Sequence, residues 1–526
     1  MKRALLAVVV LGCSSPSKPP PAPPSPPMTE SKPAVAPTPP PTTEQPPEDP
    51  YLWLEDVTGD KPIAWAKEQA AKSKAELEAV PGFTATRDRI RAILDSKEKT
   101  PYVTKRGTYY YNFWRDAQNP KGLIRRTTLA EYKKKSPKWE VMLDIDALSK
   151  TENENWVYAG NDCLYPTFDR CLVTMSRGGG DTAVVREFDI KTKKFLTDGF
   201  NLPAAKSEVA WKDRDTIYVA TDFGRGSLTK SGYPRIVKEW KRGTKLEDAV
   251  TVFEGQDSDI SVNAFRSWDH GKSMDFVNRG ISFFAQELYV RGADGKLTKL
   301  DIPNDANGGI WNDQLFVTLR TEWKIGDKTW PAGALLTTPY ADFQAGKRDF
   351  QMLFEPAPNK SLEGVTEMKT AVVVNELEDV KNKLYVWTFT KNKWTKKPFG
   401  KDSLGTTSVS SVDGYSETDD YWLIHTDYLT PSTLSLGSLG KQAAKLKTSP
   451  TFFDAKGLQV EQHFATSKDG TKVPYFQISR KAIALDGSNP TILYGYGGFE
   501  ISLTPGYDPI SGSAWLERGG VYAIAN

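Results

Sequence analysis

The sequence predicts a mostly β protein organised around a β-propeller. Aromatic residues make up 11% of the chain, with 15 Trp and 21 Tyr, and this composition favours strands over helices. From about residue 100 to residue 450, short aromatic or β-branched runs alternate with turn clusters such as Asp294-Gly295. A loose unit recurs roughly every 45 residues, the length of a propeller blade, and a segment of about 350 residues has room for about seven blades.

Five strand-like runs are rich in aromatic or β-branched residues. They are residues 109–114, 215–220, 286–290, 313–318 and 383–387. The acidic group Glu376, Glu378 and Asp379 sits in a turn beside Lys381 and Lys383 and is interpreted as a solvated loop.

Length and charge limit the possible functions. A chain of 526 residues is expected to form two or three domains. A net charge of only +3 points to neither a nucleic acid nor an acidic membrane surface as a partner. The three histidines, His270, His425 and His463, are scattered without metal-ligand spacing, so neither a metal nor another cofactor is expected.

The first 12 residues have the features of an export signal. Lys2 and Arg3 precede the apolar stretch 4–11, which is too short to span a bilayer permanently. Together with Leu11-Gly-Cys13, the segment resembles a bacterial lipoprotein signal, which implies that Cys13 becomes the lipidated first residue of an exported protein. An ordinary secretory signal cut nearby is the alternative.

Two segments separate this signal from the propeller. Residues 13–48 are rich in proline and poor in apolar side chains, so they are predicted to form a disordered tether. Residues 49–99 are predicted to be helical, with one helix over 63–80 and a shorter one over 86–95. Asp60 is the expected N-cap of the first helix, with Pro62 in its first turn.

Cys163 and Cys171 flank a turn between two strand-like runs. An oxidising compartment outside the cytoplasm favours a disulfide between them. Two free buried thiols are the alternative.

The stretch Thr491-Ile-Leu-Tyr-Gly-Tyr-Gly-Gly-Phe499 carries the main functional signal. It is an apolar β-type run that ends in a glycine-dense loop, where glycines allow positive φ and close approach of another chain. Residues 519–526 read as a second buried strand, so the two would open an α/β sheet. On pattern alone, a glycine-rich turn with aromatic packing is an equal alternative.

Two motifs resemble the prolyl oligopeptidase family of serine peptidases. One is Leu493-Tyr-Gly-Tyr-Gly-Gly-Phe499 with Gly519-Gly-Val-Tyr-Ala-Ile-Ala-Asn526; the other is Asp49-Pro-Tyr-Leu-Trp-Leu-Glu-Asp56. The resemblance implies a seven-bladed propeller over residues 100–450 and the opening strands of an α/β-hydrolase domain over 451–526. It also implies that residues 49–99 pack on that hydrolase domain, that Tyr496 donates to the oxyanion hole and that Phe499 lines the proline pocket.

The nucleophile is missing from the sequence as written. No Gly-x-Ser-x-Gly occurs, and the nearest candidate, Ser511-Gly-Ser-Ala514, precedes the second predicted sheet strand and has no histidine after it. In the resembled family, the catalytic serine, aspartate and histidine come later than Asn526. The sequence is therefore expected to be truncated before the triad and inactive.

Two functions remain open. One is a serine-type endopeptidase that cleaves short peptides on the carboxyl side of proline, represented by a truncated chain. The other is a non-enzymatic, lipid-anchored propeller that binds peptides or a partner protein. Either would be a monomer, anchored through Cys13 and facing the periplasm or the cell exterior.

Overall fold

The computed structural model describes residues 49–400, 403–499 and 501–526. The described residues up to Ala92 form one compact unit, and those from Ile93 onward form another. Cys13, the predicted signal peptide and the predicted tether lie outside the described residues. Within the described ranges, no helix combines the length and the apolar character that a membrane span requires.

The smaller unit is helical. It contains a 3-10 turn (η1, Leu52–Glu55), α2 (Asp60–Glu78) and most of α3 (Phe83–Leu94), close to the two predicted helices. The prediction that Asp60 is the N-cap is wrong: the extended residue before α2 is Gly59, and no side chain caps it. The predicted packing of this unit on the hydrolase segment stays a prediction.

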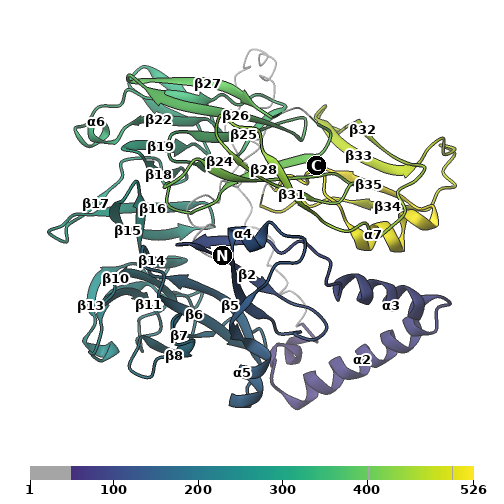
Figure 1. The fold of residues 1–526 in the computed structure, drawn as a ribbon, viewed down its shortest axis with the longest axis horizontal. Helices are drawn as coiled ribbons and strands as arrows, with labels where there is room; N and C mark the ends of the chain where they lie inside the picture. Colours follow the sequence, from purple (N-terminus) through teal and green to yellow (C-terminus); the bar gives the residue numbers. More distant parts are fainter. Residues whose placement is uncertain (1–48, 401–402, 500) are drawn as a thin grey trace, which may run out of the picture. The chain divides into compact units, whose positions relative to one another are not determined.

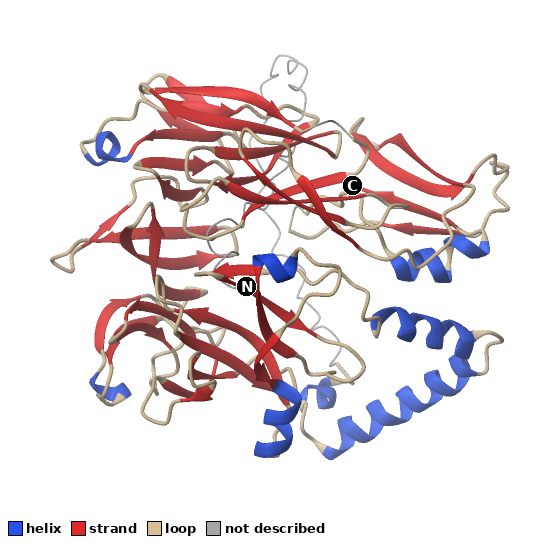
Figure 2. Ribbon diagram, in the orientation of Figure 1, coloured by secondary structure: helices blue, strands red, loops and turns tan. Residues whose placement is uncertain are grey.

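The larger unit begins with seven antiparallel sheets, each with a path of four strands; the second sheet has a fifth strand, β9 (Asn201–Ala205). Figures 1 and 2 show these sheets. The first four are β1–β4 (Thr104–Arg106, Tyr109–Trp114, Leu123–Thr128, Glu140–Asp144), β5–β8 (Trp156–Cys163, Arg170–Arg177, Ala183–Asp189, Lys194–Phe195), β10–β13 (Glu208–Asp213, Thr216–Ala220, Ile236–Lys241, Val250–Glu254) and β14–β17 (Ser261–Asp269, Lys272–Ser282, Ala285–Arg291, Leu297–Lys299). The last three are β18, β19, β22 and β23 (Asn307–Trp311, Gln314–Thr318, Leu335–Pro339, Gln351–Phe354), β24–β27 (Lys360–Glu367, Val372–Glu378, Lys381–Thr390, Lys393–Phe399) and β28–β31 (Thr406–Ser411, Asp420–Thr426, Thr433–Ser438, Ala444–Thr448).

Additional short strands and helices accompany these sheets. They are β9 (Asn201–Ala205), which pairs with β7, the hairpin β20–β21 (Trp323–Ile325, Lys328–Trp330), and the short helices α4 (Leu129–Tyr132), α5 (Ile145–Glu152) and α6 (Tyr340–Gln344). Each of the five predicted strand-like runs falls on a strand: β2, β11, β16, β19 and β26. Their aromatic and β-branched side chains suit a pleated surface that is buried between neighbouring sheets.

Apolar packing joins the seven sheets into a ring. A buried cluster lies between each sheet and the next, and each cluster draws side chains from both. The ring closes where Tyr110 and Tyr132 of the first sheet region meet Trp422 of the seventh sheet. The ring of Trp422 lies edge-on to both tyrosines, with centroids 6.1 and 5.9 Å away. The arrangement is a seven-bladed propeller closed by side chains.

The last segment forms a mixed sheet of a different kind. Its strands are β32 (Leu458–Thr466), β33 (Lys472–Arg480), β34 (Thr491–Tyr494) and β35 (Val521–Ala525), in the order β32-β33-β35-β34. β34 and β35 run parallel, and the connection between them carries α7 (Pro509–Ala514). This is the strand, crossover and strand that the sequence predicts.

The acidic group at the turn after β25 differs from its prediction. Glu376 lies within β25 and is only 1% exposed. Lys396 Nζ donates to its Oε1 at 2.5 Å, and Lys360 Nζ lies 3.4 Å from Oε2. The interpretation of Glu376 as part of a solvated loop is therefore wrong, because the neighbouring strands supply two lysines that compensate its charge.

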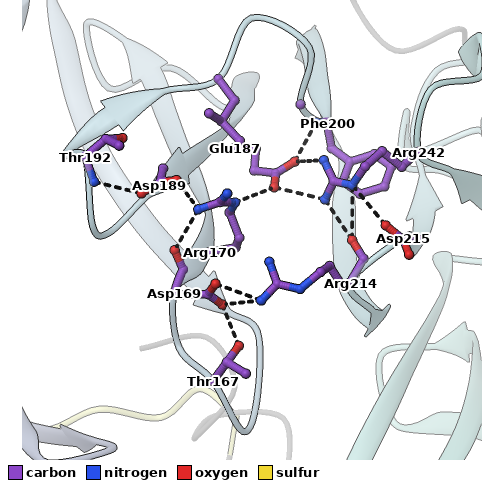
Figure 3. Close-up of polar contacts among 12 residues, drawn as sticks. Thr167, Asp169, Arg170, Glu187, Asp189, Thr192, Phe200, Arg214, Asp215 and Arg242 are labelled. Carbon is purple, nitrogen blue, oxygen red and sulfur yellow. Dashed lines mark hydrogen bonds and ion pairs between the residues drawn. The ribbon is translucent and has the colours of Figure 1, made fainter.

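A second buried carboxylate links the second and third blades (Figure 3). Glu187 on β7 is fully buried. Arg242, which follows β12, donates to both carboxylate oxygens at 2.9 and 3.0 Å, and the backbone N–H of Phe200 donates to one of them at 2.9 Å. Arg170 adds a third cationic contact at 3.6 Å. Bidentate geometry of this kind fixes orientation as well as charge.

Removing one partner from this group should destabilise the propeller. We expect Arg242→Met to lower the free energy of unfolding by about 3–5 kcal/mol, because Glu187 would be left buried without its bidentate partner. The measurement is urea denaturation of the purified chain. The double variant Glu187→Gln/Arg242→Met should recover part of the loss. Arg225→Met, at an exposed arginine of the same blade, is the control and should change little. Equal stability of the two arginine variants would contradict the prediction.

Candidate functional site

The glycine-rich loop follows the edge strand β34. Tyr496 and Phe499 are each 45% exposed, so both side chains are accessible. Gly498 lies against the phenol of Tyr496: a Cβ at this position would be 3.3 Å from Tyr496 Oη. The loop therefore leaves a phenolic O–H donor available beside backbone that lacks side-chain bulk.

Phe499 lies against the propeller. Its ring stacks on Phe283, with centroids 4.8 Å apart and planes inclined by 29°. Phe283 and Phe284 occupy the turn between β15 and β16, and the guanidinium of Arg320 lies 3.7 Å from the ring centroid of Phe284. The sequence reasoning missed this aromatic pair, although two adjacent phenylalanines at a hairpin turn, where polar residues are usual, were a usable signal.

The serines near the loop have structural roles. Ser511 Oγ donates to Asp508, the N-cap of α7, and Ser513 Oγ donates to the carbonyl of Ile510 at 3.2 Å.

The histidines have their contacts elsewhere. His270 contacts Asp269 and the Lys369 carbonyl, His425 contacts Thr407, and His463 lies 3.9 Å from Glu461. No serine–histidine hydrogen bond occurs in the described part of the chain. None of the described serines is therefore paired with a histidine that could activate it as a nucleophile.

A cavity of about 720 Å³ runs through the centre of the propeller. Its walls come mainly from the first strand of each blade: β1, β5, β10, β14, β18, β24 and β28. This volume lies within the range of small-ligand sites, and it is large enough for a short peptide. Across residues 49–400, 403–499 and 501–526, no group of three or more His, Cys, Asp or Glu side chains could hold a metal ion.

Two carboxyl groups of the cavity wall have perturbed acidity. Burial raises the pKa of the Glu363 carboxyl to about 7. Burial and, to a smaller extent, the negative charge of Asp269 raise the pKa of the Glu367 carboxyl to about 8. Both glutamates lie on β24. At neutral pH, Glu367 is therefore mostly protonated and Glu363 is divided between its two forms.

Of the two cysteines predicted to form a disulfide, Cys163 lines the cavity. Cys163 ends β5 and is the register partner of Cys171 on β6, and their sulfurs are bonded in the structure. Arg106 donates to Cys163 Sγ at 2.9 Å and to the Asn161 side chain at 2.6 Å. The bond thus joins two neighbouring strands at the cavity and holds the turn from Leu164 to Arg170.

A ring of seven antiparallel blades followed by a parallel β-α-β unit defines a propeller-bearing protein with an α/β segment after the propeller. A family model described as the prolyl oligopeptidase N-terminal beta-propeller domain matches residues 26–448. The chain belongs to the prolyl oligopeptidase family, and the predicted family and fold class are confirmed.

Similar proteins support this placement. The peptidase y4nA of Sinorhizobium fredii is 38% identical over 493 residues, which are 91% of this chain and 67% of that protein. A prolyl endopeptidase of Elizabethkingia miricola is 26% identical and is covered to 65%. The structure of a post-proline cleaving enzyme from Rickettsia typhi matches with a TM-score of 0.85 and 30% identity, over 90% of this chain and 71% of that one. The chain thus spans about two thirds of the length of these relatives.

The acidity of Glu367 predicts how stability depends on pH. Between its unfolded pKa near 4.5 and its folded pKa of about 8, the folded chain keeps a proton that the unfolded chain has lost. Stability should therefore fall as pH rises from 5 to 8, by up to about 1 kcal/mol per pH unit.

Glu367→Gln removes this titratable carboxyl group, so the free energy of unfolding should depend less steeply on pH. Thermal unfolding of the two proteins from pH 5 to pH 8 is the measurement. Glu247→Gln, at an exposed glutamate of the third blade, should retain the wild-type slope. If stability falls equally steeply with pH in the wild type and in Glu367→Gln, the raised pKa of Glu367 is contradicted.

Proposed function

We propose that the chain supplies the propeller and the oxyanion side of a serine-type endopeptidase that cleaves short peptides on the carboxyl side of proline. The observation that carries the proposal is the loop after β34, where Tyr496 and Phe499 are exposed and Phe499 stacks on Phe283 of the propeller. A phenol that donates to a developing alkoxide stabilises the tetrahedral intermediate more than the ground state.

Aromatic rings suit the other half of the proposed site. A proline ring is apolar and compact, and the exposed part of the stacked Phe499 and Phe283 rings offers an apolar surface for it. The central cavity would hold the rest of a short peptide, while a folded protein is too large to enter 720 Å³. The size of the propeller cavity therefore supports peptides, and not proteins, as substrates.

The catalytic serine, aspartate and histidine would come from sequence that residues 1–526 do not contain. We expect the 526-residue chain alone to show no turnover of a chromogenic X-Pro peptide and no labelling by a fluorophosphonate. Activity should appear when the chain is extended by the C-terminal third of the Sinorhizobium relative.

In that extended enzyme, Tyr496→Phe should lower kcat by roughly 10² or more, because it removes only the O–H. Tyr494→Phe, at an equally exposed tyrosine of β34, is the matched control and should retain activity. Labelling of the 526-residue chain would mean that it contains its own nucleophile. An inactive extended enzyme, in a chain that still binds peptides, would favour the non-enzymatic propeller instead.

We also propose that the protein is exported and anchored through Cys13. The support is the order Lys2-Arg3, an apolar stretch and Leu11-Gly-Cys13. Cys13→Ala should move the protein from the membrane fraction to the soluble fraction, because one lipidated residue supplies the anchor. Ser14→Ala is the control and should remain in the membrane fraction. A membrane-bound Cys13→Ala variant would exclude this anchor.

A further inference from the structure

Glu363 and Glu367 differ from the other acidic side chains of the cavity wall. Neither carboxyl group has an ion pair or an accepted hydrogen bond within the described residues. Both belong to β24, the innermost strand of the sixth blade, four residues apart. At about 3.3 Å per residue, they are separated by roughly 10–13 Å along the cavity, depending on the bulge at Glu363.

The other charges of the wall are Lys105, Arg106, Asp162, Glu208, Arg266 and Asp413. Arg266 pairs with Asp275 through two hydrogen bonds of 2.7 and 2.8 Å. Arg106 donates hydrogen bonds to the Asn161 side chain and to Cys163 Sγ.

The acidic side chains among them also have partners. Asp162 accepts a hydrogen bond from the backbone N–H of Trp211. Asp413 accepts hydrogen bonds from Thr418 Oγ1 and from two backbone N–H groups. Glu208 also interacts with a neighbouring group. Lys105 lies on β1, and no cation lowers the pKa of either Glu363 or Glu367.

Aromatic rings surround the end of the cavity that holds Glu367. Trp268 and Tyr415 line the cavity, and both contact Tyr165, with ring centroids 4.9 and 4.1 Å from it. Asp269, whose charge raises the pKa of Glu367, is the next residue after Trp268, so these groups lie at the same end. Asp269 itself accepts from the Asn312 backbone N–H and contacts His270.

We propose that the propeller cavity is a binding site for a short cationic peptide, with Glu363 and Glu367 as counter-ions for two of its ammonium or guanidinium groups. Trp268 and Tyr415 add aromatic surface at the Glu367 end of the cavity, since aromatic rings attract cations. Arg266, whose guanidinium lies 6.0 Å from the Trp268 ring centroid, already makes such a contact. The remaining wall is largely apolar, including Val209, Phe265 and Val365. The proposal goes beyond post-proline cleavage because it concerns the charge of the peptides that the propeller cavity admits.

The energetics favour a cation as the occupant. An unpaired carboxylate in an apolar cavity is costly, so in the empty cavity at neutral pH Glu367 is largely the neutral acid and Glu363 is partly so. A ligand ammonium compensates that charge in a medium of low polarity, where the attraction is strong. Binding therefore ionises Glu367 and releases a proton near pH 7. Affinity should rise as pH increases from 6 to 8, where the lysines of a ligand remain charged.

The test is isothermal titration of the full 526-residue chain with acetyl-Lys-Gly-Gly-Lys-amide and with its glutamine analogue. At pH 8, the lysine peptide should bind at least about tenfold more tightly than the glutamine peptide. Glu363→Gln and Glu367→Gln should each weaken binding of the lysine peptide by about tenfold or more, while Glu247→Gln should not. Glu367→Gln should also remove most of the gain in affinity between pH 6 and pH 8.

Equal binding of the two peptides, or wild-type affinity in both cavity variants, would overturn the proposal. The glutamine variants keep the shape of the neutral acids, and thermal unfolding at pH 6 checks that each variant is folded. Because the titration measures binding without turnover, its outcome does not depend on the proposed peptidase activity. A failed titration with an active extended enzyme would reject only the cation site, and the reverse result would reject only the peptidase assignment.

Discussion

The propeller depends on side-chain packing at the junction between its first and last blades. The four strands of the first blade come from residues 104–144 and those of the seventh from 406–448, and the junction is made by Tyr110, Tyr132 and Trp422. Dispersion and apolar burial at this aromatic contact thus join parts of the chain that are about 300 residues apart in sequence. Every blade interface around the ring uses the same kind of contact.

Ring closure creates the cavity and decides its chemistry. Seven innermost strands face one another across a space that their side chains do not fill, so groups on different blades share an enclosed, largely apolar environment. Such an environment strengthens the effect of each charge that it contains. The raised pKa values of Glu363 and Glu367 follow from this enclosure, and their positions on β24 place both carboxyls along one wall.

Four glutamates of the propeller show two ways in which a carboxyl group is accommodated away from water. Glu187 and Glu376 are compensated by arginines or lysines from neighbouring strands, and they contribute to the cohesion of the blades. Glu363 and Glu367 have no such partner among the described residues, and burial raises the pKa of each carboxyl group. Compensated charges stabilise structure, whereas uncompensated groups beside open space can respond to a ligand.

The sequence by itself determined the local elements and the family. Strand periodicity, the helices of residues 49–99, the Cys163–Cys171 turn and the Tyr-Gly-Tyr-Gly-Gly-Phe loop are local patterns that near neighbours in the chain specify. Tertiary structure alone decided that Phe283 stacks on Phe499, that Glu376 is buried between two lysines, and that Glu363 and Glu367 share a cavity. These features depend on contacts between segments tens to hundreds of residues apart, and hydrophobic periodicity carries no information about such pairings.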